Sequence, residues 1–143
     1  LVIERVFNAS PERVFAAWTD PDMLVRWWGP EGHHIPESTI DVREGGAYRT
    51  VMESDTGDRH TVSGVFREIA PPERLVMTFG WEQPDGTRGH ETLVEITFEP
   101  AGDGTRLRLV QRVFETTEGR DNHGKGWTSS LNCLEAFLAE TAA

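Results

Sequence analysis

The sequence predicts an α+β fold in which a curved antiparallel sheet packs around one long helix at the end of the chain. Three observations support this. Six short stretches of alternating apolar and polar residues run from Ile35 to Phe114, a tryptophan-rich helical segment precedes them, and one long amphipathic segment follows them. Only the closing helix is long enough to cover the apolar face of such a sheet, so we expect the two to pack together and enclose a ligand cavity.

The first thirty residues predict one strand followed by two short helices. A strand is expected over Leu1–Phe7. Ser10-Pro11 and Asp20-Pro21 each combine a side-chain cap with a proline at the first helical position, which is typical of a helix start. Gly29-Pro30 is expected to end the second helix.

The middle of the chain predicts a meander of six antiparallel strands. Turn-forming residues divide it at five places: Glu44-Gly45-Gly46, Asp55-Thr56-Gly57-Asp58, Pro71-Pro72-Glu73, Pro84-Asp85-Gly86 and Ala101-Gly102-Asp103-Gly104. With the first strand, the sheet has seven strands. Alternation assigns one set of side chains to its inner face: Tyr48, Thr50, Met52, Leu75, Met77, Phe79, Trp81, Val94, Ile96, Phe98, Leu107 and Leu109.

The closing helix is predicted from about Asn122 to Glu140. Its apolar stripe has spacings of four, three and four residues and consists of Trp127, Leu131, Leu134 and Leu138. At 1.5 Å per residue the helix would be roughly 28 Å long, which is enough to cross a sheet.

Length and composition indicate a single domain that does not bind polyanions. The chain has 143 residues and a net charge of −10, so a nucleic acid or an anionic membrane would be repelled. No apolar run approaches the roughly 20 residues that cross a bilayer, and we expect a cytoplasmic protein. The chain starts at Leu1, and the sequence does not tell whether residues precede it. The single cysteine, Cys133, is expected to be a buried small hydrophobe.

Several motifs in this order are similar to those of a known family, the Hsp90 ATPase activator homologue 1-like group of the START-like (SRPBCC, Bet v 1-like) superfamily. The resemblance covers essentially the whole chain. The segments that carry it are Ser10 to Pro21, Trp27-Trp28-Gly29-Pro30, Asp41 to Gly46, Ile69 to Val76, and Gly126-Trp127.

The resemblance implies a helix-grip fold with two short helices inserted after the first strand. Its functional implications are broader, because relatives include carriers of lipids and hydrophobic molecules, polyketide cyclases, resistance proteins and co-chaperone domains. The eukaryotic co-chaperone has a separate N-terminal domain for which this chain has no room. We therefore do not expect activation of Hsp90.

The first functional hypothesis is a protein that binds a small hydrophobic or amphipathic molecule between the sheet and the terminal helix. The residues expected to line this cavity combine the inner face of the sheet with the helix stripe. They are Trp127, Leu131, Trp81, Phe79, Met77, Tyr48, Met52 and His90.

Two other hypotheses use different residues. In a cyclase-like or hydrolase-like enzyme, His90, Tyr48 or Glu68 would move a proton inside the cavity, and His123 at the start of the helix could also reach it. In a co-chaperone-like or homodimeric protein, an exposed aromatic patch around Trp27-Trp28 would contact the partner. Neither a cofactor nor a metal is expected, since no His-x-x-x-His or Cys-x-x-Cys pattern occurs.

Overall fold

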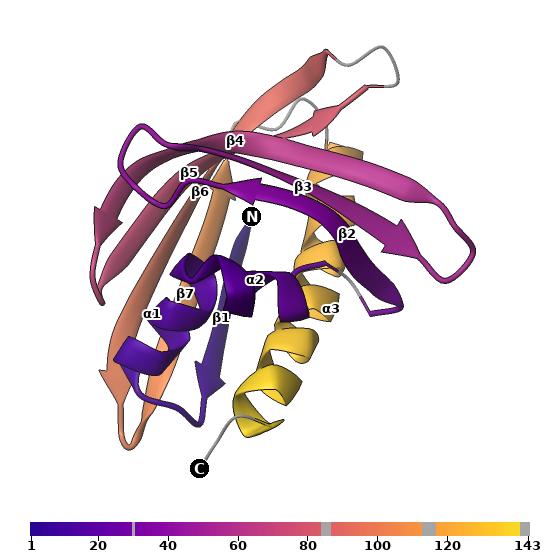
Figure 1. Cartoon of the computed structure of the whole chain (residues 1–143). Coiled ribbons are helices and arrows are strands. Elements are labelled where there is room, and N and C mark those ends of the chain that lie inside the picture. Colours follow the sequence, from indigo (N-terminus) through magenta and orange to yellow (C-terminus); the bar gives the residue numbers. More distant parts are fainter. Residues whose placement is uncertain (30, 84–86, 113–116, 141–143) are drawn as a thin grey trace.

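The computed structural model describes residues 1–29, 31–83, 87–112 and 117–140. Within these ranges the chain forms a seven-stranded antiparallel sheet and three helices (Figure 1). In chain order the elements are β1 (Val2–Phe7), α1 (Pro11–Thr19), α2 (Pro21–Trp27), β2 (His33–Ile40), β3 (Ala47–Ser54), β4 (Arg59–Ala70), β5 (Arg74–Glu82), β6 (Arg88–Ala101), β7 (Gly104–Arg112) and α3 (Thr117–Glu140). This is the predicted helix-grip architecture.

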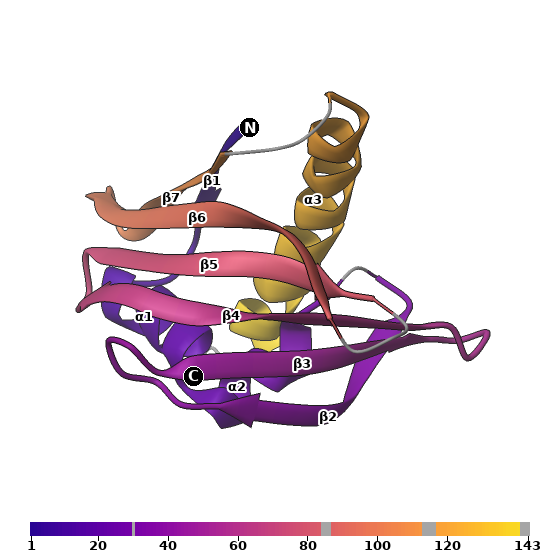
Figure 2. The same ribbon diagram turned by 90° about the horizontal axis from the view of Figure 1, so that it is seen from above.

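The strands follow the order β1-β7-β6-β5-β4-β3-β2, so that β2 to β7 form a meander and β1 pairs with the last strand. Pairing registers shift within β2, β4 and β5. Such bulges bend a strand and increase its twist. The sheet therefore curves, and its concave side faces the helices, as Figures 1 and 2 show.

One residue both ends α1 and starts α2. The backbone N–H of Asp20 donates to the Ala16 carbonyl, and its carboxylate accepts a hydrogen bond from the Asp22 N–H at 3.0 Å. Ser10 caps α1 by accepting from the Arg13 N–H. Both predicted helix starts are confirmed. At the end of α2, Gly29 adopts a φ of 101°, and Pro30 lies outside the described residues.

The inner face of the sheet is the one that alternation predicted. The side chains assigned to it are all buried except Trp81, which is 36% exposed. Residues of the opposite phase, such as Arg49, Arg106 and Arg108, are exposed. The predicted turn at Pro84-Asp85-Gly86 and the predicted end of the last strand at Phe114 lie outside the described residues.

The closing helix begins five residues before its predicted start, at Thr117 instead of Asn122. The apolar stripe starts only at Trp127, so the polar first turns give no helical periodicity to detect. From Trp127 onward the stripe is buried as expected. Among the described residues, no helix combines the length and apolar character needed to cross a lipid bilayer.

Candidate functional site

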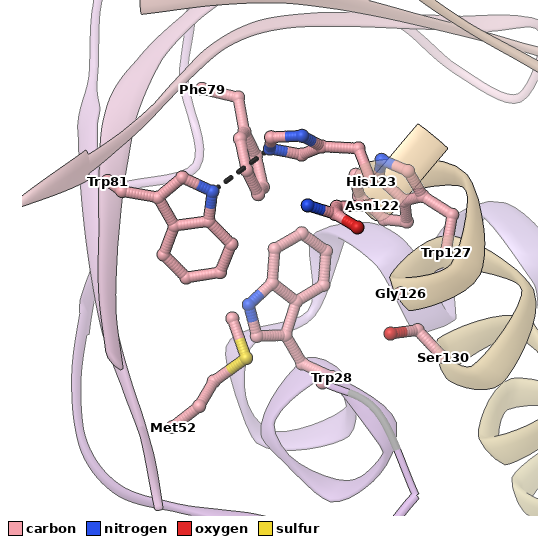
Figure 3. A pocket seen from close by; sticks show the side chains of 10 residues that line it. Trp28, Met52, Phe79, Trp81, Asn122, His123, Gly126, Trp127 and Ser130 are labelled. Carbon is pink, nitrogen blue, oxygen red and sulfur yellow. Dashed lines mark hydrogen bonds between the residues drawn. The ribbon is translucent and has the colours of Figure 1, made fainter. Parts of the chain in front are cut away.

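A cavity of about 140 Å³ lies between the first half of α3, the end of β5, strand β3 and the segment that follows α2 (Figure 3). Its wall is mostly apolar, and aromatic rings form most of it. The described residues that line it are Trp28, Gly29, Met52, Phe79, Trp81, Asn122, His123, Gly126, Trp127 and Ser130.

Phe79 is the centre of the aromatic wall. Its ring centroid lies 5.4 Å from that of Trp81, 5.6 Å from Trp127, 5.8 Å from His123 and 6.4 Å from Trp28. The Phe79 and Trp81 planes are perpendicular, at 89°. Ring pairs at these distances and steep angles attract one another, so the wall is held in shape by its own members.

A buried chain of hydrogen bonds holds Trp127 from behind. The indole N–H of Trp127 donates to the side-chain oxygen of Gln111 at 2.7 Å, and the Gln111 amide donates to the Thr92 hydroxyl at 2.7 Å. Thr92 in turn donates to the Phe79 carbonyl at 2.9 Å. Because Gln111 is fully buried, these bonds satisfy polar groups that would otherwise be costly to bury. They fix the orientation of the Trp127 ring.

The other two indoles of the pocket are also hydrogen-bonded. Trp28 donates its N–H to the hydroxyl of Thr50 at 3.0 Å. Trp81 donates to Nε2 of His123 at 2.9 Å, which places the imidazole lone pair on that nitrogen (Figure 3). This last bond joins β5 to α3 beside the exposed edge of the pocket.

The α3 side of the cavity is made of small and polar residues. Asn122, Gly126 and Ser130 follow one another at intervals of four and therefore share one face of the helix. A Cβ atom added at Gly126 would meet nothing within 4 Å. The absence of a side chain there leaves part of the cavity open.

Half of the residues predicted to line the cavity do so. Trp127, Trp81, Phe79 and Met52 face it. The other four are placed elsewhere: Leu131, Met77 and Tyr48 are buried within the core, and His90 is exposed.

Two local features explain why Tyr48 and His90 do not line the cavity. The Tyr48 hydroxyl donates to the carbonyl of Thr78 at 2.5 Å, and its ring packs on Phe66, 5.5 Å between centroids. His90 lies in the part of β6 opposite the register shift between Gly80 and Glu82. There the β5–β6 hairpin projects beyond the helix, as Figure 1 shows, so inward phase no longer means burial.

Of the residues weighed for the two other hypotheses, His123 and Trp28 line the cavity, whereas His90, Tyr48, Glu68 and Trp27 do not. Glu68 forms an ion pair with Arg74 at 2.9 Å, and it does not line the pocket. Trp27 and Trp28 are 2% and 5% exposed, so they form no surface patch for a partner. Among the described residues, no group of three or more His, Cys, Asp or Glu side chains could hold a metal ion.

Six lining residues were absent from the predicted set: Trp28, Gly29, Asn122, His123, Gly126 and Ser130. A signal existed for part of this set, because Asn122, Gly126 and Ser130 occupy one helix face at four-residue intervals. Small polar residues on that face indicate that the sheet is not packed tightly against it. His123 had been considered for the cavity only as a proton-transfer candidate.

The cysteine of α3 has a perturbed thiol. Burial raises the pKa of Cys133 above its usual value, and the nearby carboxylate of Glu31 raises it further. A raised pKa leaves less thiolate, and the thiolate is the reactive form. Cys133 is partly buried against the core, which agrees with a structural role.

Comparison with known proteins supports the class that this fold and site define. The chain has 39% identity with the AHSA1 protein from Silicibacter pomeroyi, covering 99% of each chain with a TM-score of 0.91. It has 32% identity with a protein from Chromobacterium violaceum, over 95% of this chain and 94% of that one, with a TM-score of 0.80. A protein from Arthrobacter aurescens is 26% identical over 99% of this chain and 86% of that one, with a TM-score of 0.88.

A sheet curved around a C-terminal helix, with an aromatic cavity between them, is a helix-grip domain of the START-like type. Residues 8–139 match the family model described as "Activator of Hsp90 ATPase homolog 1-like protein". The chain belongs to this family. No curated protein matches it.

Proposed function

We propose that the chain binds a small hydrophobic or amphipathic molecule in the aromatic pocket between β5 and α3. The observation that carries this proposal is an apolar hollow, open to solvent at one side, between the sheet and α3. Protein interiors normally contain few voids larger than a water molecule. A hollow of about 140 Å³ with mostly apolar walls is therefore larger than the voids of a close-packed interior, and it is reachable from solvent.

The size of the pocket limits the buried part of the ligand to about one small ring system or a short apolar chain. An engineered apolar cavity of about 150 Å³ in another protein stays dry and binds benzene or xenon. The present cavity has similar volume. It is open at one side, where Trp81 is 36% exposed, so a longer polar part of the ligand can extend into solvent.

The pocket also offers a polar side that would orient an amphipathic molecule. Asn122 and Ser130 bring an amide and a hydroxyl to the α3 wall, opposite the rings of β5 (Figure 3). A ligand with one apolar end and one hydrogen-bonding group could satisfy both surfaces. Few polar groups in an apolar wall are typical of small-molecule sites.

The proposal is tested with Gly126→Leu, which fills the pocket. The new side chain enters space in which a Cβ meets no atom within 4 Å, so it should be accommodated by the fold. A panel of benzyl alcohol, indole, 3,3-dimethylbutan-1-ol, choline and octanoate is titrated while melting temperature and tryptophan fluorescence are followed. A ligand at 100 times its dissociation constant stabilises the native state by about 2.7 kcal/mol.

We expect at least one compound to raise the melting temperature of the native protein and to leave Gly126→Leu unchanged. The matched control is Gly124→Leu, two residues away on α3 and outside the pocket, which should keep the response. The proposal fails if no compound acts on the native protein, or if Gly126→Leu responds as strongly as the native protein does.

A further inference from the structure

We infer that the pocket selects a compact alkylated ammonium cation, such as a trimethylammonium group, over a neutral group of the same shape. This inference rests on the proposed function, because it names the chemical class of the ligand in that same site. It follows from two features of the aromatic residues: their rings surround the cavity, and their indole N–H groups are hydrogen-bonded to other side chains.

Three tryptophans and one phenylalanine surround the space from separate elements. Trp28 follows α2, Phe79 and Trp81 lie on β5, and Trp127 lies on α3 (Figure 3). An aromatic face carries a negative quadrupole that attracts cations within about 6 Å of its centroid, and tryptophan is the strongest of these rings. Several such rings around one small space are the arrangement by which aromatic cages bind quaternary ammonium groups.

The polar edges of these rings are not available to a ligand. Each of the three indole N–H groups is already donated, by Trp28 to Thr50, by Trp127 to Gln111 and by Trp81 to His123. The tryptophans therefore offer the ligand their carbon surfaces and π-electrons, and not hydrogen-bond donors. A ligand that needs several donors, such as a carboxylate or phosphate, gains little from them.

The charges of the site point in the same direction. The described lining residues include no lysine and no arginine, so no ammonium or guanidinium group there would pair with an anion. Elsewhere Arg5 lies over Phe7 and Arg26 lies over Phe137, at 5.7 and 5.0 Å from the ring centroids. Among the described residues, no such cation lies over the four pocket rings. A net charge of −10 raises the local concentration of cations around the protein.

Size and hydration also favour an alkylated ammonium group over a simple ammonium. A trimethylammonium group has about the bulk of a six-membered ring, which suits a cavity of about 140 Å³. Its methyl groups replace hydrogen-bond donors with apolar surface, so it can leave water for a wall that returns few hydrogen bonds. A lysine-like ammonium would lose hydration without replacement.

The test compares choline with 3,3-dimethylbutan-1-ol, its neutral isostere, by calorimetry on the native protein at constant ionic strength. The two molecules have the same shape and the same hydroxyl, and differ in a central nitrogen cation or carbon. We expect choline to bind at least about tenfold more tightly, which corresponds to about 1.4 kcal/mol.

Trp81→Leu separates the π-contribution from simple apolar contact. Trp81 lies at the exposed edge of the pocket, so its replacement should leave the fold intact, which circular dichroism can verify. The variant should lose most of the preference for choline while binding the neutral isostere within a few-fold of the native protein. Equal losses for both compounds would indicate that the ring acts only through apolar contact and would overturn the inference.

Other outcomes separate this inference from the proposed function. If the isostere binds as tightly as choline or more tightly, the cation preference is wrong and the pocket is a site for neutral molecules. If neither compound binds, the cation inference is again wrong, and the proposed function is decided by the remaining compounds of the panel and by Gly126→Leu.

Discussion

Two parts of α3 face the same curved sheet but meet it differently: residues 117–130, called the first half, and residues 131–140, called the second half. The second half packs tightly: Leu131, Leu134 and Leu138 are buried in the core, and Phe137 lies beside them. The first half borders the 140 Å³ cavity instead. One helix and one sheet thus form both a closed interface and an open one.

The difference lies in the helix and not in the sheet. At four-residue intervals the first half presents Asn122, Gly126 and Ser130, whereas the second half presents leucines. Rings from the sheet and from Trp28 extend into the space that these small residues leave. Small residues on the helix therefore leave the pocket open, while aromatic contacts and buried hydrogen bonds support the opposite wall.

The largest effect is expected at the closed half, in Leu134→Ala. Leu134 is fully buried, and removing such a side chain costs the lost burial and leaves a cavity, in total about 2–5 kcal/mol of unfolding free energy. Urea denaturation measures this. Val6→Ala, at a residue that is 56% exposed, is the control and should change stability by less than about 1 kcal/mol. Similar small effects at both residues would contradict a close-packed second half.

An intermediate effect is expected where the open half is supported, in Gln111→Leu. This change leaves the indole N–H of Trp127 and the hydroxyl of Thr92 without their Gln111 partner inside the core. An unsatisfied buried group costs about 1–3 kcal/mol. Denaturation of Gln111→Leu, Trp127→Phe and the double variant forms a mutant cycle. We expect the two changes together to cost less than their sum, and strict additivity would show that the hydrogen bond does not support the wall.

A smaller and opposite effect is expected from Gly126→Ala. A glycine inside a helix costs about 1 kcal/mol relative to alanine, and the added methyl group meets no atom within 4 Å. Unfolding free energy should therefore rise by up to about 1 kcal/mol. Gly124→Ala is the matched comparison, because its Cβ would approach the Leu1 side chain at 3.3 Å and should give a smaller gain. A loss of stability in Gly126→Ala would mean that the first half is packed more closely than the cavity implies.

The smallest effect is expected in the rate at which the Cys133 thiol, in the second half of α3, reacts with an alkylating reagent. Because burial and Glu31 raise the pKa of Cys133, less thiolate is present at a given pH than in an unfolded chain. Labelling by iodoacetamide at pH 8 should be slower for the native protein than for the protein in urea, and it should accelerate as pH rises. Glu31→Gln should speed labelling modestly, since it removes the second cause. Equal rates in native and unfolded protein would contradict a raised pKa.

Most of the fold could be predicted from the sequence because burial in this molecule follows regular periods. Period two along the strands assigned the inner face, and the caps at Ser10 and Asp20 located both short helices. The start of α3 was misplaced because its first turns are polar and carry no apolar period.

The pocket could be predicted only in part, because it depends on residues that break those periods. Gln111 lies in phase with Leu107 and Leu109, so a polar residue facing inward was visible in the sequence and could have indicated a buried network. The inward phase of His90 was misleading, since that part of β6 extends beyond the helix. Trp28 follows a helix and belongs to no periodic pattern, so only the three-dimensional arrangement could place it in the wall.

The central claim, that the open half of the α3 interface is the ligand site, is tested most directly by the five indole N–H signals in a proton–nitrogen correlation spectrum. The five compounds of the panel are added in turn, with signals assigned by Trp→Phe variants. We predict the largest shifts at Trp81, Trp28 and Trp127, because these rings line the cavity, and smaller ones at Trp18 and Trp27, which do not. No shift with any of the five compounds, or shifts largest at Trp18 and Trp27, would contradict the account.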